Sequence, residues 1–333
     1  MKSPGRRLPI ALTCVSLVAC EGSQSMLDTA GAQATTIATL WWTMLAVSVA
    51  VVLAVTIFLF IAIFRKRDEA EDRARTDRGS VRVVVMSTAL TTAILLGTFL
   101  YSMVVSRSAA ALAVPGAQEI HIVGHQWWWD VTYVDSVPAR SFRTANEIHL
   151  PAGESVQLKL SSRDVIHSFW IPNLHGKLDL IPGRVNTLWI RAERPGVYRG
   201  QCAEFCGMQH AKMAFDVVVH EPADFERWKA EQLAPASDPT DSLAIRGREV
   251  FLGTACVTCH TVRGTPASAT AGPDLTHVAS RLTLGAASTP NTPGHMAGWI
   301  ADPQGIKPGN RMPRVPLDAP DLTALLAYMA TLQ

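Results

Sequence analysis

The chain has little net charge and few cysteines, and both shortages narrow what it can be. Its 30 Lys and Arg residues nearly balance 28 Asp and Glu residues, which leaves a formal net charge of +2. There is no basic stripe, so nothing in the sequence indicates a nucleic-acid partner. Only 6 of the 333 residues are Cys, whereas 48% are hydrophobic. This length and composition are sufficient for two or three domains.

Two stretches have no charged residue at all, residues 40–64 and 83–106. At about 1.5 Å per helical residue, each is long enough to cross a hydrocarbon core of about 30 Å. A buried core helix could also be apolar, but two uncharged runs of this length indicate two transmembrane helices. The segment between them, residues 65–82, contains seven Lys or Arg. The positive-inside rule therefore places it in the cytoplasm as a loop, and everything after Ser106 outside the cytoplasm.

The start of the chain resembles a bacterial lipoprotein signal. Lys2, Arg6 and Arg7 precede an apolar stretch too short to span a membrane, which ends in "LVAC" at Cys20. This pattern predicts a signal peptide over residues 1–19 and a lipidated Cys20 as the mature N-terminus. An extracytoplasmic segment over residues 20–39 would follow. The alternative is a plain signal peptide in which Cys20 is incidental.

The remaining cysteines are too few for a disulfide framework. Disulfides are common outside the cytoplasm, but Cys14 falls in the signal and Cys20 at the lipidation site. Two pairs are left, in "QCAEFCGMQHAKM" at 201–213 and in "CVTCH" at 256–260. The first pair lies beside a histidine and a methionine. Methionine is a poor zinc ligand, whereas cysteine, histidine and methionine together suit copper. For a second histidine, both His167 and His175 are candidates.

The residues around the first cysteine pair are typical of β structure. "SVQLKL" alternates apolar and polar residues, "VNTLWI" and "AFDVVV" are rich in β-branched residues, and Gly and Pro separate them. We expect a Greek-key sandwich with the ligand loop between its last two strands, at 197–198 and 215–219. A rigid sandwich keeps a metal site in the same geometry in both oxidation states. This favours electron transfer over bond-making chemistry.

Residues 40–220 resemble subunit II of the haem–copper cytochrome c oxidases. The motifs that carry the resemblance are "GHQWWW" at 124–129, "DVIHSFWIP" at 164–172, "DLIPGR" at 179–184 and "GQCAEFCGMQHAKM" at 200–213. The resemblance implies a cupredoxin-like domain over residues 115–232 that holds a dinuclear copper centre of the CuA type. By this resemblance, the thiolates of Cys202 and Cys206 would bridge the two coppers, and His167 and His210 would each cap one of them. Met213 and the backbone carbonyl of Glu204 would be weak outer ligands.

The same resemblance bears on three further residues of this domain, Glu204, Trp127 and His175. The side chain of Glu204 would share a magnesium ion with the catalytic subunit, and hard cations do prefer carboxylate oxygens. Trp127 would be the surface aromatic near which an electron donor docks. His175 falls on no ligand position and is interpreted as a loop residue. If "WWW" lies in a strand, alternation places Trp127 and Trp129 on one face and Trp128 on the other; packing in the aromatic core is the alternative for these residues.

A second resemblance begins after a short Pro, Ser and Asp linker over residues 233–241. "CVTCH" is the attachment signature of haem c, although alone it could be a zinc or redox motif. With "GPDLTHVASR", "MP" and the terminal "PDLTALLAYMATL", residues 242–333 resemble a class I cytochrome c domain. The resemblance implies thioether bonds from Cys256 and Cys259 and a proximal ligand at His260. For the distal ligand the candidates are Met296, Met312, Met329, His277 and His295, of which Met312 in "RMP" matches the methionine loop of that family.

The two resemblances together predict a fused subunit II of the caa type in a bacterial inner membrane. We expect it to carry electrons from an external cytochrome or quinol-oxidising complex, through haem c and copper, to a proton-pumping subunit I, with subunit III as a further partner. The spans hold no Asp, Glu, His, Lys or Arg, so oxygen and proton chemistry would belong to the partner. The second span also lacks an acid that subunits II often carry, which leaves a role in proton uptake open. The alternatives are the electron-entry subunit of a nitric-oxide reductase and a membrane-bound copper-delivery protein.

Overall fold

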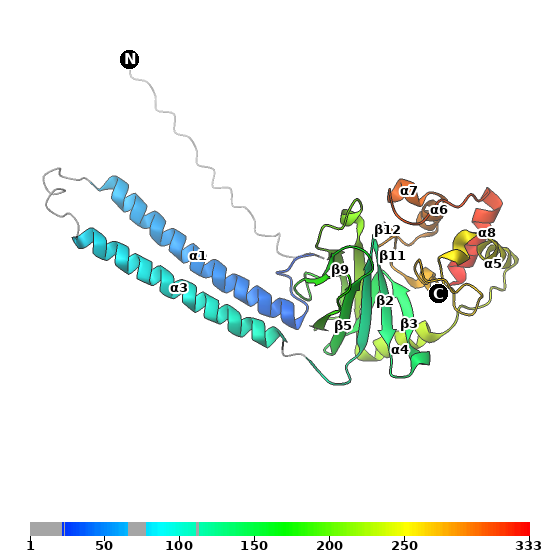
Figure 1. Ribbon diagram of the computed structural model, residues 1–333, viewed down its shortest axis with the longest axis horizontal. Helices are drawn as coiled ribbons and strands as arrows, with labels where there is room; N and C mark the ends of the chain where they lie inside the picture. Colours follow the sequence, from blue (N-terminus) through cyan, green and yellow to red (C-terminus); the bar gives the residue numbers. More distant parts are fainter. Residues whose placement is uncertain (1–21, 23, 66–77, 111–112) are drawn as a thin grey trace, which may run out of the picture.

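The computed structural model describes residues 22, 24–65, 78–110 and 113–333, without the side chains of Arg78 and residues 108–110. Three parts follow one another along the chain and in space: a pair of long helices, a β-sandwich and a small helical domain (Figure 1). The predicted signal over residues 1–19, Cys20 and most of the predicted cytoplasmic loop lie outside the described residues. The fold class predicted from the sequence is confirmed by this succession of parts.

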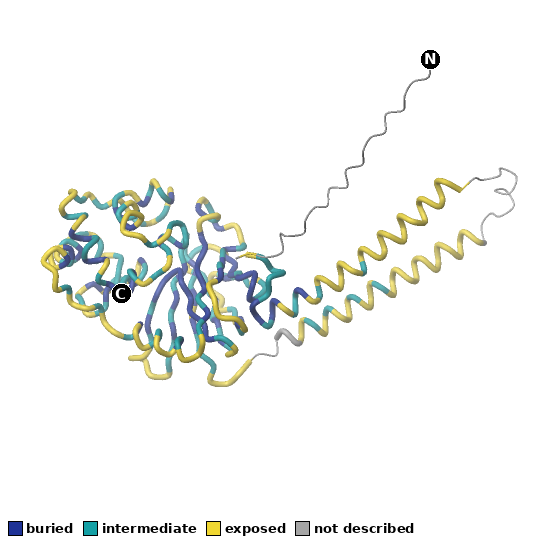
Figure 2. Tube along the Cα trace, turned by 180° about the vertical axis from the view of Figure 1, so that it is seen from behind, coloured by how far each residue is buried: buried dark blue, intermediate teal, exposed yellow. Residues whose placement is uncertain are grey.

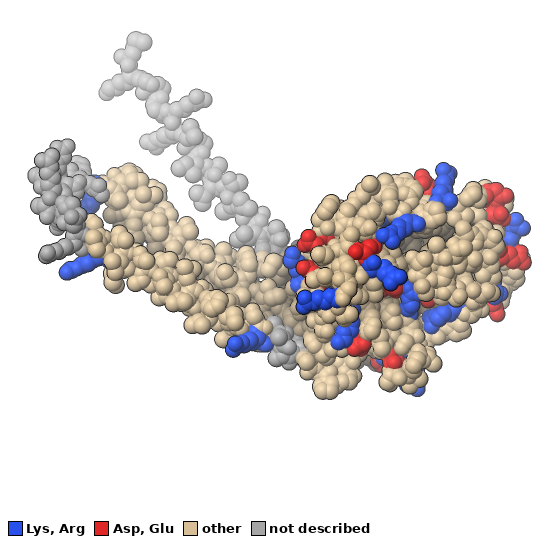
Figure 3. Space-filling view, in the orientation of Figure 1, with Lys and Arg blue, Asp and Glu red and all other residues tan. Residues whose placement is uncertain are grey.

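The long helices are α1 (Ala32–Phe64) and α3 (Arg78–Ala110), which lie side by side (Figure 1). Residues 32–64 and 79–107 are long and apolar enough to cross a membrane. Their apolar side chains are exposed along most of their length (Figure 2), and the pair is almost free of charged residues between its ends (Figure 3). Apolar surface on this scale is unfavourable in water. The helices therefore form the membrane anchor.

Helix α1 begins before the apolar stretch because its first turns pack on the sandwich. Gln33, Ala34 and Ala38 are buried there, and the Gln33 side chain donates a hydrogen bond of 2.8 Å to the Trp189 carbonyl. Just before the helix, Gly31 approaches the backbone so closely that a Cβ at this position would lie 2.4 Å from the Leu174 carbonyl oxygen. Only glycine fits there. The anchor and the sandwich are thus joined by packing as well as by the chain.

The sandwich consists of two five-stranded sheets. The first has the order β3-β2-β1-β5-β8 and contains β1 (Glu119–His125), β2 (Trp128–Val134), β3 (Phe142–Ala145), β5 (Ser155–Ser162) and β8 (Asn186–Arg191). The second has the order β4-β10-β9-β6-β7 and contains β4 (Glu147–Pro151), β6 (His167–Trp170), β7 (Leu178–Leu180), β9 (Gly196–Cys202) and β10 (Ala214–His220).

The core lies between these sheets because alternate residues of each strand point inward. In β1 and β5 this alternation buries Ile120, Ile122 and Leu158 completely. The pairs β1–β5 and β4–β10 are parallel whereas their neighbours are antiparallel, so the chain crosses between the sheets. The last two strands, β9 and β10, pair antiparallel, as the sequence predicted. Helix α4 (Pro222–Leu233) then packs on β4 and β10.

One expectation about the tryptophans is wrong. Strand β1 ends at His125 and β2 begins at Trp128, so Gln126 and Trp127 form the turn of a hairpin. Strand alternation therefore does not apply to Trp127. Trp129 is completely buried in the core, where its ring packs edge-to-face on Phe169 and Phe215.

The C-terminal domain contains α5 (Ser242–Gly253), α6 (Pro293–Ala301), α7 (Pro303–Ile306), α8 (Ala319–Thr331) and the short strands β11 (Thr283–Leu284) and β12 (Thr289–Pro290). The described part of the chain also contains four short 3-10 helices, η1 (Pro138–Arg140), η2 (His210–Lys212), η3 (Ala255–Thr258) and η4 (Val278–Ser280). Asp241 caps α5 and Asp318 caps α8 by accepting hydrogen bonds from backbone N–H groups. The two helices cross so closely at Gly247 that a Cβ there would lie 1.9 Å from the Ala324 carbonyl oxygen.

This crossing gives a first prediction. Gly247→Ala should lower the free energy of unfolding of the C-terminal domain by about 1–3 kcal/mol, because the added methyl group would push α5 and α8 apart. Guanidinium unfolding of the full chain, followed by the absorption of bound haem, measures the loss. Gly253→Ala is the matched control, since it lies in the same helix with open space around its Cα. Equal effects of both variants would contradict the explanation.

Candidate copper and haem sites

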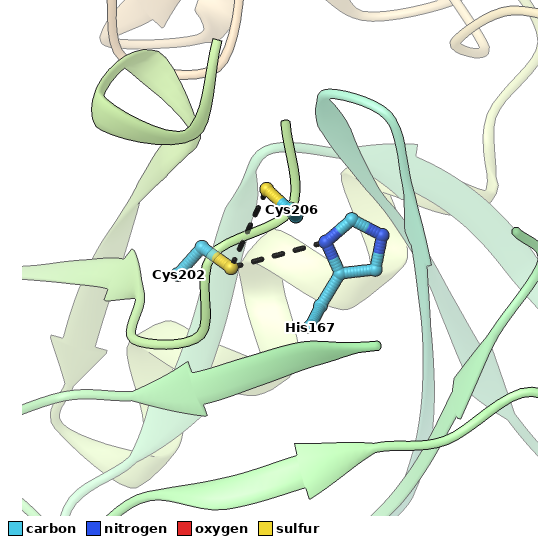
Figure 4. Close-up of side chains that lie close together, drawn as sticks. All are labelled: His167, Cys202 and Cys206. Atoms are coloured by element: carbon cyan, nitrogen blue, oxygen red, sulfur yellow. Dashed lines mark hydrogen bonds between the residues drawn. The ribbon is translucent and has the colours of Figure 1, made fainter. Parts of the chain in front are cut away.

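Two cysteines and a histidine meet at one end of the sandwich. Cys202 ends β9, Cys206 lies in the following loop, and His167 begins β6 (Figure 4). The two sulfurs are 3.9 Å apart, and the His167 Nδ1 lies 3.8 Å from the Cys202 sulfur. All three side chains are buried, and their ligand atoms lie within 4.8 Å of one another. Donor atoms gathered this closely can bind a metal ion.

The structure brings the other three predicted copper ligands to the same place. The His210 Nδ1 lies 3.6 Å from the Cys206 sulfur, the Met213 sulfur lies 3.8 Å from it, and the Glu204 carbonyl oxygen lies 3.2 Å from the Cys202 sulfur. His175 is elsewhere, with its Nδ1 bonded to the Gly176 carbonyl. The interpretation of His175 as a loop residue agrees with this position.

The two thiols influence each other's ionisation. Their mutual hydrogen bond lowers the pKa of Cys202 and raises the pKa of Cys206. One thiolate therefore forms readily, whereas a second negative charge beside it needs a cation to stabilise it. Thiolate, imidazole and thioether donors are soft or borderline ligands. The residues present thus fit copper.

Asp164 holds His167 in place, a role that the sequence reasoning did not identify. Its carboxylate accepts a 2.9 Å hydrogen bond from the His167 Nε2 and a 2.8 Å hydrogen bond from the Gln126 backbone N–H. Burial raises the pKa of Asp164, but these hydrogen bonds outweigh it and the pKa is lowered. Because Nε2 carries the proton, Nδ1 is free to face the sulfurs. The "DxxH" spacing was the available signal.

The Glu204 side chain is exposed, and no other carboxylate or histidine gathers with it among the residues that the structure describes. This part of the chain alone gives no support to a magnesium site. Such a site would depend on groups from a partner subunit.

A cavity of about 210 Å³ lies in the C-terminal domain, where it faces the sandwich. Its lining includes all four predicted haem residues, Cys256, Cys259, His260 and Met312. Met296 and Met329 also line it, but both belong to the buried hydrophobic core of the domain. His277 and His295 are not part of the lining.

His260 is oriented as an iron ligand would be. Its Nδ1 donates a 2.8 Å hydrogen bond to the Pro273 carbonyl, which leaves Nε2 without the proton and free to bind a metal. Burial lowers the pKa of His260, so the ring is neutral. Gly272 packs against this ring, and a Cβ there would lie 2.9 Å from the His260 Cε1. A fixed neutral imidazole beside two cysteines fits covalently attached haem.

Trp127 connects the cavity to the copper loop. Gln126, Trp127 and Trp128 belong to the sandwich, yet all three line the cavity of the neighbouring domain. The indole N–H of Trp127 donates a 3.0 Å hydrogen bond to the Cys206 carbonyl, and the Gln126 side-chain amide donates to the same oxygen at 2.8 Å. One turn therefore touches both candidate sites.

Fold and sites together define a membrane-anchored electron-transfer protein in which a cupredoxin domain precedes a c-type cytochrome domain. Comparison with known proteins agrees. Residues 134–221 match the family model of the cytochrome c oxidase subunit II periplasmic domain, and residues 244–333 match that of cytochrome c.

Relatives of known name extend the match to the whole chain. The cytochrome c oxidase subunit 2 of Alkalihalophilus pseudofirmus is 31% identical over 100% of this chain and 98% of its own length. That of Bacillus subtilis is 31% identical over 58% of this chain and 55% of its own length. The periplasmic domain of subunit II (CoxB) of Bradyrhizobium japonicum is 32% identical over 36% of this chain and 96% of its own, with a TM-score of 0.34. The chain belongs to the cytochrome c oxidase subunit 2 family.

Membership in this family has direct consequences. The chain is part of an oxidoreductase complex, has an electron-entry role and has subunit I of a haem–copper oxidase as its partner. Its two matched domains imply copper and haem c, and they are extracytoplasmic parts of a membrane protein. The nitric-oxide reductase and copper-delivery alternatives are not favoured.

The geometry around Asp164 gives a second prediction. Asp164→Asn should weaken copper retention by about 10- to 100-fold, because it removes the carboxylate that orients His167. Competition with a copper chelator, monitored by electron paramagnetic resonance, measures the change. Asp130→Asn is the control, since Asp130 is a partly buried carboxylate of the same domain that pairs with Arg143 at 2.6 Å. Equal copper loss from both variants would contradict an orienting role.

Proposed function

We propose that this chain accepts electrons from an external donor at its cytochrome c domain and passes them through its copper domain to subunit I. The observation that carries the proposal is the shared wall between the sites. Trp127 lines the cavity of the cytochrome domain and donates a hydrogen bond to the backbone of Cys206. An electron leaving the cavity therefore meets the copper loop without crossing bulk solvent.

The proposal assigns residues to each of the two groups. Cys256, Cys259, His260 and Met312 would hold haem c, the two cysteines by covalent attachment. Cys202, Cys206, His167, His210, Met213 and the Glu204 carbonyl would hold the copper. When bound, both groups supply reversible one-electron oxidation and reduction, and a methionine ligand raises the potential of the haem.

The chain's own contribution is a dry and fixed environment. Cys202, Cys206, His167 and Met213 are buried, and β6, β9 and β10 are neighbours in one sheet. Ligands held by paired strands move little when the charge of a bound metal changes. Trp127 would act as the aromatic contact between the two sites, rather than as a surface for a separate donor.

We further propose the following arrangement in a bacterial inner membrane. Residues 1–19 would be removed as a signal peptide, and Cys20 would carry lipid. Residues 40–64 and 83–106 would span the bilayer on either side of a cytoplasmic loop over residues 65–82. The copper domain (115–232), the linker (233–241) and the cytochrome domain (242–333) would lie on the periplasmic face.

The partners follow from what this chain lacks. Residues 40–64 and 83–106 hold no Asp, Glu, His, Lys or Arg, so oxygen reduction and proton pumping would take place in subunit I. Subunit III would be a further partner, and an external cytochrome or quinol-oxidising complex would be the donor. Glu204, which is exposed on the copper loop, would share a magnesium ion with subunit I.

A third prediction tests the order of transfer in the full oxidase complex. Met213→Leu should alter the copper centre and leave the haem c spectrum unchanged, and reduced haem c should accumulate during turnover with donor and oxygen. Met312→His should keep haem c bound but lower its potential, because imidazole favours reduced iron less than thioether does. Copper should then stay mostly oxidised. Optical spectra during turnover measure both states, and each variant is the control for the other.

The opposite pattern would contradict the proposed route. If haem c stayed oxidised in the Met213→Leu variant while turnover stalled, electrons would be entering at the copper domain directly. The cytochrome domain would then be a side branch.

A further inference from the structure

Lys307 is a buried lysine between the two domains. It is the only lysine after residue 229, it follows α7, and its side chain is 2% exposed. Charged side chains are almost never buried to this degree without partners, because removing the charge from water is costly. Its partners therefore explain why a lysine occupies this position.

The ammonium group bonds to three backbone carbonyl oxygens. The distances are 2.7 Å to Trp127, 2.6 Å to Lys212 and 2.9 Å to Gly285. An ammonium has three N–H donors, so all of them are used. Gly285 belongs to the cytochrome domain, whereas Trp127 and Lys212 belong to the copper domain.

Both copper-domain acceptors lie next to the copper loop. Lys212 directly precedes Met213 in the chain. Trp127 donates its indole N–H to the Cys206 carbonyl while its own carbonyl accepts from Lys307. Lys307 also lines the cavity of the cytochrome domain. Its side chain thus connects the wall of the haem cavity to the end of the copper loop at Lys212 and to the Trp127 turn, which bonds to Cys206 in the middle of that loop.

We propose that Lys307 is a positioning residue that pins the fused cytochrome domain to the copper domain in one docked geometry. Electron transfer between the domains would then start from this fixed arrangement, not from a domain that swings on its linker. The inference rests on the proposed order of transfer, but docking itself can be measured independently of that order.

Other hydrogen bonds and one ion pair also join the two domains. The Thr283 hydroxyl donates to Asp216 at 2.6 Å, the Leu282 N–H donates to Glu147 at 2.8 Å, and the Gln209 amide donates to the Pro308 carbonyl at 2.6 Å. Arg311 reaches Asp164 at 3.3 Å, but its side chain is 62% exposed and such an ion pair contributes little. Lys307, by contrast, is almost completely buried and donates to three backbone carbonyls.

The burial explains why docking depends on this residue. The Lys307 side chain supplies a donor to all three carbonyls at the interface. With methionine in its place, the Gly285 carbonyl would keep the Ser288 hydroxyl at 2.7 Å, but the Trp127 and Lys212 carbonyls would lose this donor in the docked state, whereas the undocked state would leave them hydrated. Residues 234–241, between α4 and α5, would keep the undocked domain tethered at an effective concentration on the order of millimolar. The two cofactor sites would stay loaded while their spacing became variable.

The experiment uses the full oxidase complex with Lys307→Met and, as control, Arg314→Met. Arg314 is exposed in the loop that follows, so its replacement removes the same charge without touching the interface. Hydrogen–deuterium exchange of peptides covering 126–128 and 209–213 reports docking. Rapid-mixing absorption spectroscopy separates reduction of haem c by the donor from transfer between haem c and copper.

We expect Lys307→Met to speed exchange in these peptides and to slow transfer between the domains, each by on the order of tenfold or more. Reduction of haem c by the donor and the haem spectrum should match those of the parent. Arg314→Met should match the parent throughout. Unchanged exchange together with unchanged transfer in Lys307→Met would overturn the proposal.

A rescue variant separates positioning from local support of the haem cavity. In Asp216→Cys with Thr283→Cys, two thiols would face each other across the interface, where the parent side chains are hydrogen-bonded at 2.6 Å. Added oxidised glutathione, which is reduced as it takes up the two electrons and two protons of the thiols, would convert them into a disulfide that joins the domains. It should restore protection and transfer in the Lys307→Met background. A cross-link that forms without restoring transfer would overturn the proposal. So would loss of haem c from both Lys307→Met and Lys307→Gln, since the lysine would then support the cavity itself.

The same measurements distinguish an error in the proposed order of electron transfer from an error in the proposed docking role of Lys307. If exchange responds to Lys307→Met as expected but copper is reduced without passage through haem c, docking by Lys307 stands and the order of transfer is wrong.

Discussion

A single hydrogen bond, from the Cys202 N–H to the Met213 carbonyl at 2.9 Å, closes the copper loop at its base. It continues the antiparallel pairing of β9 with β10, so the loop leaves one strand and returns to the next without a gap. The first and last predicted ligands of the loop are thereby brought side by side, and the residues between them turn inward over His167. If β9 and β10 separated, the sulfur and nitrogen donors would lose their common position. The geometry of the site is thus a property of the sheet.

The copper loop also forms part of the surface on which the cytochrome domain docks. Gln209 and Lys212 lie within it, and both bond to residues 306–308 of the neighbouring domain. The Gln126–Trp127 turn belongs to the same docking surface, because it bonds to the Cys206 carbonyl and lines the cavity of the cytochrome domain. Docking and metal binding therefore draw on one set of backbone segments. A change that loosens the loop should affect both, whereas a change at Lys307 should affect docking alone.

How much of this could be predicted depended on whether the signal was local in the chain. The sandwich, the two apolar helices and the cytochrome fold follow from alternation, from absence of charge and from "CVTCH", which all lie within short windows. Five of the six predicted copper residues share one loop, namely Cys202, Glu204, Cys206, His210 and Met213. The spacing of the cysteines, the histidine and the methionine indicated the site, whereas the Glu204 carbonyl came from the resemblance. His167 and His175 were both candidates for the second histidine, and the resemblance of "DVIHSFWIP" selected His167.

The features that escaped prediction arise from contacts between distant segments. Strand alternation failed for Trp127 because a turn interrupts the run of tryptophans, and aromatic residues rarely indicate a turn. Asp164 lies only three residues from His167, but its other partners, the Gln126 backbone N–H and Arg311, come from distant segments of the chain. The sequence did not indicate the role of Lys307, because its acceptors are the backbone carbonyls of residues 127, 212 and 285. Every residue has such a carbonyl, so no residue type marks the acceptor.

Other contacts between separate parts of the molecule also use a side-chain donor and a backbone carbonyl as the acceptor. Gln33 bonds to the Trp189 carbonyl where α1 meets the sandwich, and Asn173 donates to the carbonyls of Ser25 and Asp28 where the N-terminal segment crosses it. Lys307 does the same where the cytochrome domain docks. In each case a buried side chain supplies the donor and the backbone supplies the acceptor. Because the acceptor exists whatever the side chain, replacing Trp189 or Gly285 leaves the bond possible if the backbone keeps its path. Replacing the donor removes it, so the donor side chain at each of these contacts carries the requirement on sequence.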